Sequence, residues 1–180
     1  MGTLRFSING KPVELGDVSS NETVLNFLRR EQRLAGTKEG CAEGDCGACT
    51  VLMLDGDGPT GPIYRAVNSC LLLLPMVHGR QLFTVEGLEG TQFHVVQEAL
   101  VEALGSQCGY CTPGIAMSMA ELAYREDLDE PWKLEDQLCG NLCRCTGYVQ
   151  IIEAVMLAAA ALCLPASLSA NCYGNCTHLT

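Results

Sequence analysis

Apolar and polar residues alternate at the start of the chain, in the segment LRFSINGKPVEL. The alternation runs on both sides of Asn9-Gly10, and an Asn-Gly pair between two alternating segments is a strong signal for a β-hairpin. Three later segments, CTVLML, YRAVNSC and QLFTVEG, have the composition and bounding residues of further strands. The segment DGDGPTGP between two of them is a loose turn. The pattern therefore predicts a sheet of four to five strands.

One helix is expected between the hairpin and the third strand. Val24, Phe27 and Leu28 have the spacing that places apolar side chains on one face of a helix. Ser19 and Glu22 precede them at the spacing of a capping box. The pattern predicts a helix of about a dozen residues packed across the sheet.

The period becomes helical in the second half of the chain. HVVQEALVEALG has apolar residues three and four positions apart, and TPGIAMSMAELAYRE begins with Thr112 as an N-cap and Pro113 at the first helical position. A short third helix is expected over residues 132–139. A fourth is expected in TGYVQIIEAVMLAAAALCL, capped by Thr146.

These elements predict an α+β protein with two domains and a tail. Residues 1–87 form a small domain of strands with one helix, and residues 88–164 form a four-helix bundle. Residues 165–180 are expected to form an irregular tail.

Composition and charge narrow the classes of function. The 48% apolar and 18% charged content fits a globular protein, and the 21 acidic against 11 basic residues give a net charge of −10. Such a surface repels phosphate backbones and anionic lipids, so nucleic-acid binding is not expected. The longest apolar run, residues 154–164, is too short to span a bilayer, and the N-terminus lacks the apolar region of a signal peptide. We therefore expect a soluble, cytoplasmic protein without membrane insertion.

Twelve cysteines in a cytoplasmic protein favour metal binding over disulfides. The first set has the spacing C-x4-C-x2-C…C, which is typical of a plant-type [2Fe–2S] cluster. Small residues separate these cysteines, as a loop needs when its backbone N–H groups point inward to the sulfur atoms of a cluster. Spacing and context favour this cluster over zinc. The set comprises Cys41, Cys46, Cys49 and Cys70.

A second set of cysteines lies on turns between the predicted helices. Cys108-x2-Cys111 falls between the first and second helices, and Cys143-x-Cys145 falls between the third and fourth. The two turns can meet at one pole of a bundle, where four thiolates make a closed site. The spacing alone fits a second [2Fe–2S] cluster and a zinc ion about equally well.

The remaining cysteines have simpler interpretations. Cys139 and Cys163 lie in helical segments and are expected to be buried thiols. Cys172, Cys176 and His178 form a short tract near the end of the chain, where such tracts are usually incidental.

Three motifs, TKEGCAEGDCGACTV, SQCGYCTPG and GNLCRCTGY, resemble in order and interval the iron–sulfur part of the xanthine dehydrogenase and molybdenum hydroxylase family. The resemblance covers residues 1 to about 155. It implies a plant-ferredoxin-like β-grasp domain followed by a four-helix domain, each with one [2Fe–2S] cluster. The implied ligands are Cys41, Cys46, Cys49 and Cys70 for the ferredoxin-type cluster, and Cys108, Cys111, Cys143 and Cys145 for the helical one.

The same resemblance implies the partners. Gln107 and Cys145 would lie against a molybdopterin cofactor on a large partner subunit, and FAD would lie on a further partner subunit. Electrons would pass from the molybdenum–pterin centre to the helical cluster, then to the ferredoxin-type cluster, to FAD, and to NAD or another acceptor. In many members the FAD domain follows on the same polypeptide, for which 180 residues leave no room. We therefore expect a separate small subunit or one piece of a divided protein.

Two classes of function remain at this point. The favoured one is the electron-transfer subunit of a xanthine dehydrogenase, or of a related aldehyde or N-heteroaromatic dehydrogenase, with no catalytic residues of its own. The alternative is a free-standing ferredoxin-like carrier or a zinc-binding interaction module. A free carrier would have little use for a second cluster in a separate helical domain, so the subunit is the better hypothesis.

Overall fold

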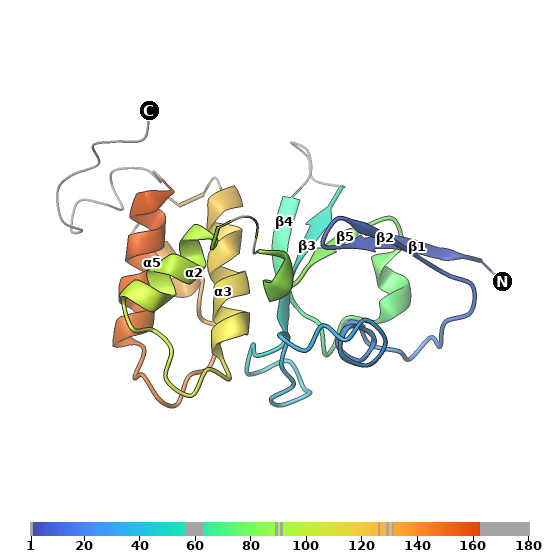
Figure 1. The fold of residues 1–180 in the computed structure, drawn as a ribbon, viewed down its shortest axis with the longest axis horizontal. Coiled ribbons are helices and arrows are strands. Elements are labelled where there is room, and N and C mark those ends of the chain that lie inside the picture. Colours follow the sequence, from blue (N-terminus) through green and yellow to red (C-terminus); the bar gives the residue numbers. More distant parts are fainter. Residues whose placement is uncertain are drawn as a thin grey trace.

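The chain folds into a sheet half and a helical half that lie side by side (Figure 1). The computed structural model describes residues 2–56, 63–88, 90, 92–125, 127, 128, 130 and 132–162. Within these residues no helix has both the length and the apolar content needed to cross a membrane. The predicted tail over residues 165–180 lies outside the described part of the chain.

The sheet has five strands in the order β2-β1-β5-β3-β4. β1 pairs in parallel with β5, and the other neighbouring strands pair antiparallel. The predicted hairpin is confirmed: Ile8 pairs with Lys11, and the connection has φ of 49° at Asn9 and 76° at Gly10, the left-handed pair that a tight hairpin turn requires. The strands are β1 (Leu4–Ile8), β2 (Lys11–Leu15), β3 (Thr50–Asp55), β4 (Ile63–Asn68) and β5 (Gln81–Phe83).

A short helical segment covers one face of the sheet. It consists of α1 (Val24–Asn26) and the π-helical η1 (Phe27–Glu31), so it is shorter than the sequence pattern predicts. The predicted capping box is wrong, because the Thr23 side chain caps the helix by accepting a hydrogen bond from Asn26 N. Apolar side chains from this segment pack on β1, β3 and β5. The rings of Phe6 and Phe27 pack edge to face, with their centroids 5.9 Å apart.

Short helices of the 3-10 type connect the larger elements. η2 (Leu74–Val77) precedes β5, and η3 (Val85–Gly87) follows it. η4 (Leu122–Tyr124) follows the second helix of the helical half.

The helical half packs on the other face of the sheet through α3 (Figure 1). Strand alternation explains how: Val51 and Met53 face α1 and η1, whereas Leu52 between them belongs to the core of the helices. Strands and helices thus form the mixed α+β arrangement that the sequence predicts. The long helices are α2 (Val95–Glu102), α3 (Thr112–Glu121) and α5 (Val149–Ala161), and a short α4 spans Trp132–Asp136.

Two helix starts in this half differ from the predictions, α3 by one position and α5 by two. α3 begins at Thr112 with Cys111 as its N-cap, because the Thr112 hydroxyl donates to Ser106 Oγ instead of capping the helix. α5 begins at Val149, after Tyr148 with a φ of 71°, so Thr146 lies outside the helix.

The two halves approach at backbone distance near the first cysteine loop. A Cβ on Gly114 of α3 would overlap the carbonyl oxygen of Gly47 and lie 3.2 Å from Ala48 Cα. Both neighbours are backbone atoms that cannot rotate away. Glycine at position 114 is therefore required by packing, although it is a weak helix former.

We predict that Gly114→Ala lowers the melting temperature. Alanine favours a helix by about 1 kcal/mol, but overpacking at a backbone contact costs about 1–3 kcal/mol, so we expect net destabilisation. Gly140→Ala is the matched control, because a Cβ there would meet nothing within 4 Å. Thermal unfolding checks this, and a Gly114→Ala variant as stable as the parent chain would contradict the close approach.

Candidate metal centres

The first three cysteines lie on the loop between η1 and β3, and the fourth lies two residues after the end of β4. The loop turns through left-handed backbone at Gly44, where φ is 88° and a side chain would collide with Leu71. At Gly40 a Cβ would lie 2.6 Å from Cys46 Sγ. These two glycines leave the space in which the loop folds back over its own thiols.

The thiols of this set approach one another in pairs. The backbone N–H of Glu43 donates to Cys41 Sγ at 3.5 Å and, together with the Cys46 thiol, lowers the pKa of Cys41 to about 7. Burial and the Cys49 thiol raise the pKa of Cys70 to about 11. The charge of Cys41 also raises the pKa of Cys70. The structure thus pairs Cys41 with Cys46 and Cys49 with Cys70, and that the four bind one cluster stays a prediction.

Polar contacts fix the loop around these pairs. Asn68 of β4 donates from Nδ2 to the carbonyl of Gly44 at 2.6 Å, and its Oδ1 accepts from the Cys49 thiol at 3.9 Å. The hydroxyl of Ser69 donates to the Cys49 carbonyl at 2.7 Å. Asn68 therefore supports both the glycine-rich turn and one thiol, a role that the sequence did not reveal.

The second set also meets in pairs, between the turn before α3 and the turn before α5. The backbone N–H of Tyr110 and the Cys145 thiol lower the pKa of Cys108. Burial and the Cys143 thiol raise the pKa of Cys111 to about 12. These contacts pair Cys108 with Cys145 and Cys111 with Cys143, one member from each turn.

Pairs of thiols suit a binuclear cluster. No three His, Cys, Asp or Glu side chains of the described residues converge tightly enough to hold a single metal ion. In a [2Fe–2S] cluster four thiolates bind two irons, so two neighbouring pairs provide the required donor set. The residues present therefore fit such a cluster at each site, and its chemistry when bound is the transfer of one electron.

Thr146 contacts the second set instead of capping α5. Its hydroxyl donates to Cys143 Sγ at 3.2 Å and accepts from the backbone N–H of Tyr148 at 3.1 Å. Burial raises the pKa of Cys143, but the Thr146 hydroxyl and the backbone N–H groups of Thr146 and Cys145 outweigh it, and the pKa is lowered. A hydroxyl three residues after a cysteine was the available signal for this contact.

The structure gives the exposure of Gln107 and of most of the predicted cysteines. Gln107, Cys108 and Cys145 are exposed, whereas Cys49, Cys70 and Cys143 are buried. Cys139 is exposed, so its prediction as a buried thiol is wrong: it follows the end of α4 on a turn and does not lie in a helix. Cys163, Cys172, Cys176 and His178 lie outside the described residues.

Two family models match the chain. The 2Fe-2S iron-sulfur cluster binding domain matches residues 6–72, and the [2Fe-2S] binding domain matches residues 84–156. The first match contains the first set of cysteines and the second match contains the second set. The two ranges do not overlap.

Curated relatives and solved structures agree with these matches. The chain is 48% identical over 154 residues to xanthine dehydrogenase of Calliphora vicina and 44% identical over 153 residues to xanthine dehydrogenase/oxidase of Gallus gallus. These matches cover 84% and 83% of the chain, which spans 11% of the length of each relative.

Two solved structures are similar along most of the chain. Quinoline 2-oxidoreductase from Pseudomonas putida 86 matches with a TM-score of 0.73 and 35% identity, over 89% of this chain and 95% of that one. The aldehyde oxidoreductase from Desulfovibrio desulfuricans matches with a TM-score of 0.77 and 34% identity, over 90% of this chain and 17% of that one.

We predict that Thr146→Val lowers the reduction potential of the cluster in the helical half. A hydrogen bond to a ligating sulfur stabilises the more negative, reduced state, so its loss favours the oxidised state. If the bond is worth about 1 kcal/mol more in the reduced state, the shift is roughly 40 mV. Redox titration followed by electron paramagnetic resonance measures it. Thr146→Ser keeps the hydroxyl and should titrate like the parent; an equal shift in both variants would contradict the role of the hydrogen bond.

Proposed function

Because this chain belongs to the molybdenum hydroxylase family as an iron–sulfur electron-transfer component, we propose that it relays electrons from a molybdenum–pterin centre to FAD. The relay uses two [2Fe–2S] clusters, and the final acceptor is NAD or another oxidant. In this proposal the enzyme is a xanthine dehydrogenase, and substrate is bound by the partner and not by this chain. No side chain of this chain has a catalytic role in the proposal.

The pairing of thiols is the observation that carries the ligand assignment. Cys41 with Cys46 and Cys49 with Cys70 form the ferredoxin-type set. In the helical set, Cys108 pairs with Cys145 and Cys111 with Cys143. Two separate sets of four thiols support one cluster in each half.

The domain assignment is part of the same proposal. We assign residues 1–87 to a plant-ferredoxin-like β-grasp domain and residues 88–164 to a four-helix domain. The hairpin, the mixed sheet and the helix across it support the first assignment, and the two family matches, which end at residue 72 and begin at residue 84, support a division into two domains.

Exposure supports the proposed direction of the relay. Gln107 and Cys145 are exposed at the helical set, so a pterin cofactor on a molybdopterin-binding subunit could contact them directly. The ferredoxin-type set lies beyond the junction and would pass electrons to an FAD-binding subunit. A cytoplasmic location suits the arrangement, because a reducing compartment keeps free cysteines available as ligands.

The chemical class of the substrate follows from the partner. Xanthine dehydrogenases are the relatives with 48% identity, so purines are the first proposal. The matches to aldehyde oxidase 2 of Macaca fascicularis and to quinoline 2-oxidoreductase make aldehydes and N-heteroaromatic compounds the alternatives.

We predict that Cys70→Ser damages the ferredoxin-type cluster and leaves the helical one. The two ligand sets lie in different halves of the chain, so one loss need not affect the other. Electron paramagnetic resonance of the reduced variant should lack one of two signals. Cys139→Ser, an exposed cysteine outside both sets, is the control and should retain both. Loss of both signals in Cys70→Ser, with the fold intact by circular dichroism, would contradict the assignment.

We predict that Gln107→Ala slows reduction of the clusters by substrate in the assembled enzyme. Removing the amide would cost one hydrogen bond to the pterin, worth about 1 kcal/mol, while both clusters stay intact. Stopped-flow absorbance measures the reduction. Gln32→Ala, exposed in the sheet half, is the control. Equal rates for Gln107→Ala and the parent enzyme would rule out the contact.

A further inference from the structure

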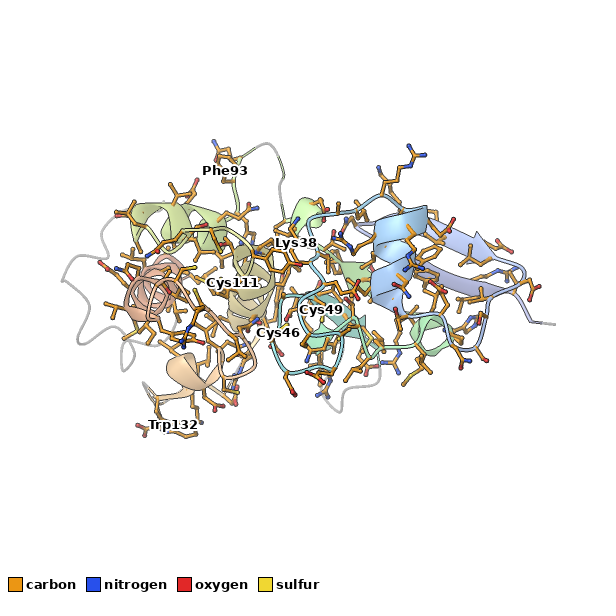
Figure 2. The ribbon with its side chains drawn as sticks, turned by 90° about the horizontal axis from the view of Figure 1, so that it is seen from below. Lys38, Cys46, Cys49, Phe93, Cys111 and Trp132 are labelled. Atoms are coloured by element: carbon orange, nitrogen blue, oxygen red, sulfur yellow. The ribbon has the colours of Figure 1, made fainter. Side chains whose placement is uncertain are left out.

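The helix α2 begins at a histidine cap. His94 is the N-cap residue, and its Nδ1 atom accepts a hydrogen bond from the backbone N–H of Val96 at 3.4 Å. In return, Gln97 Oε1 accepts from the backbone N–H of His94 at 2.9 Å, which completes a capping box. Figure 2 shows Phe93, the residue before the cap, at the surface beside the start of this helix. Two reciprocal bonds therefore hold the first turn of α2, and one of them uses an imidazole nitrogen.

An imidazole cap differs from the usual caps in its response to pH. Serine, threonine, asparagine and aspartate are the common N-cap residues, and none of them ordinarily changes charge between pH 5 and 8, whereas histidine does. The Nδ1 atom of His94 accepts a bond only while it carries no proton. A proton on Nδ1 turns the atom into a donor, so the N–H of Val96 would lose its partner. The new positive charge would also lie at the positive end of the helix dipole. Both effects disfavour the closed cap.

We propose that His94 is an acid-sensitive switch at the start of α2. While its ring is neutral, the capping bond to Val96 holds the first turn of the helix closed. When the ring is protonated, that bond is lost and the turn opens. The inference concerns the helix itself, so it does not depend on which metal the cysteine sets bind.

The surroundings of His94 favour its neutral form. Burial is the cause that lowers the pKa of His94 below its usual value of 6.5. The cap therefore contributes stability that is fully present above about pH 6.5 and is lost as the pH falls through the lowered pKa. The helix α2 packs against α5 and α3, and no Lys or Arg lies on these three helices. The carboxylates of the three helices and of the preceding η3 make no contribution to the shift, so none of them compensates the charge of a protonated ring. They are Glu86, Glu98, Glu102, Glu121 and Glu153.

The residue that the cap holds is also the first buried residue of α2. Val96 is 0% exposed, and Ala99 and Leu100 follow it into the core that the helices share. Opening the cap frees the N–H of Val96 and so weakens the packing of α2 on this core where the helix begins. The apolar core beneath the sheet is a separate cluster of residues, so we expect the effect of acid to be confined to the helical half.

The chain offers a matched control in a second histidine. His78 Nδ1 also accepts a backbone bond, from Arg5 N of β1 at 3.2 Å. His78 is exposed, follows the short η2 in the sheet half and caps the start of no described helix. Its protonation would release the N–H of Arg5 and leave α2 untouched. A change at α2 that survives the substitution His78→Asn is therefore not caused by His78.

Hydrogen exchange of the full chain between pH 8 and pH 5 tests the switch. The protection factor compares the exchange of an amide with that of an unstructured amide at the same pH, so the chemical dependence of exchange on pH cancels. We expect the protection of the Val96 amide to fall about fivefold from pH 8 to pH 5, as the loss of one N-cap implies. His94→Asn keeps a capping acceptor that does not titrate, so its protection should stay constant over this range. His94→Ala removes the acceptor and should show the low protection at both pH values.

Each outcome decides for or against the switch. A parent chain with equal protection of Val96 at both pH values would overturn it. The same fall in His94→Asn as in the parent would overturn it as well, because the fall would then arise elsewhere. His78→Asn should show the fall of the parent chain, and a constant protection in that variant would move the switch to His78. The proposed function is tested separately by the iron and sulfide content of the chain, so the failure of one leaves the other standing.

Discussion

The backbone contact between Gly47 and α3 at Gly114 is the constraint on which the arrangement of both sites depends. With no Cβ on Gly114, the first cysteine loop and α3 approach at backbone distance. That approach brings Leu142 N within 2.9 Å of the Cys46 carbonyl and lets Asn141 reach Gly47. The sheet and the helices add a shared apolar core through Leu52, so the separation of the two cysteine sets is fixed by packing.

The two sites differ in their access to solvent. Cys49 and Cys70 are buried, whereas Cys108 and Cys145 are exposed beside Gln107. The exposed thiols of the helical set are accessible to a cofactor on a partner. The buried thiols of the first set are shielded from such direct contact. The proposed relay uses this asymmetry, because its first contact lies at the exposed edge of the helical set.

Local patterns predicted much of the fold, and cysteine spacing led to the proposed ligand sets. Asn9-Gly10 fixed the hairpin because both residues accept a positive φ, and cysteine spacing grouped the eight thiols because clusters impose short loops. Contacts between distant segments could not be read in the same way. Asn141 contacts Gly47, 94 positions away, and Tyr110 contacts Glu39, 71 positions away. The start of α5 was misplaced because the Thr146 hydroxyl serves a thiol, a competition that helix-capping patterns do not include.

Iron and acid-labile sulfide analysis of the chain, made with sufficient iron and without oxygen, tests the central claim most directly. Two binuclear clusters require four irons and four sulfides per chain, with a brown colour that dithionite bleaches. A folded chain that holds stoichiometric zinc and no sulfide would contradict the account.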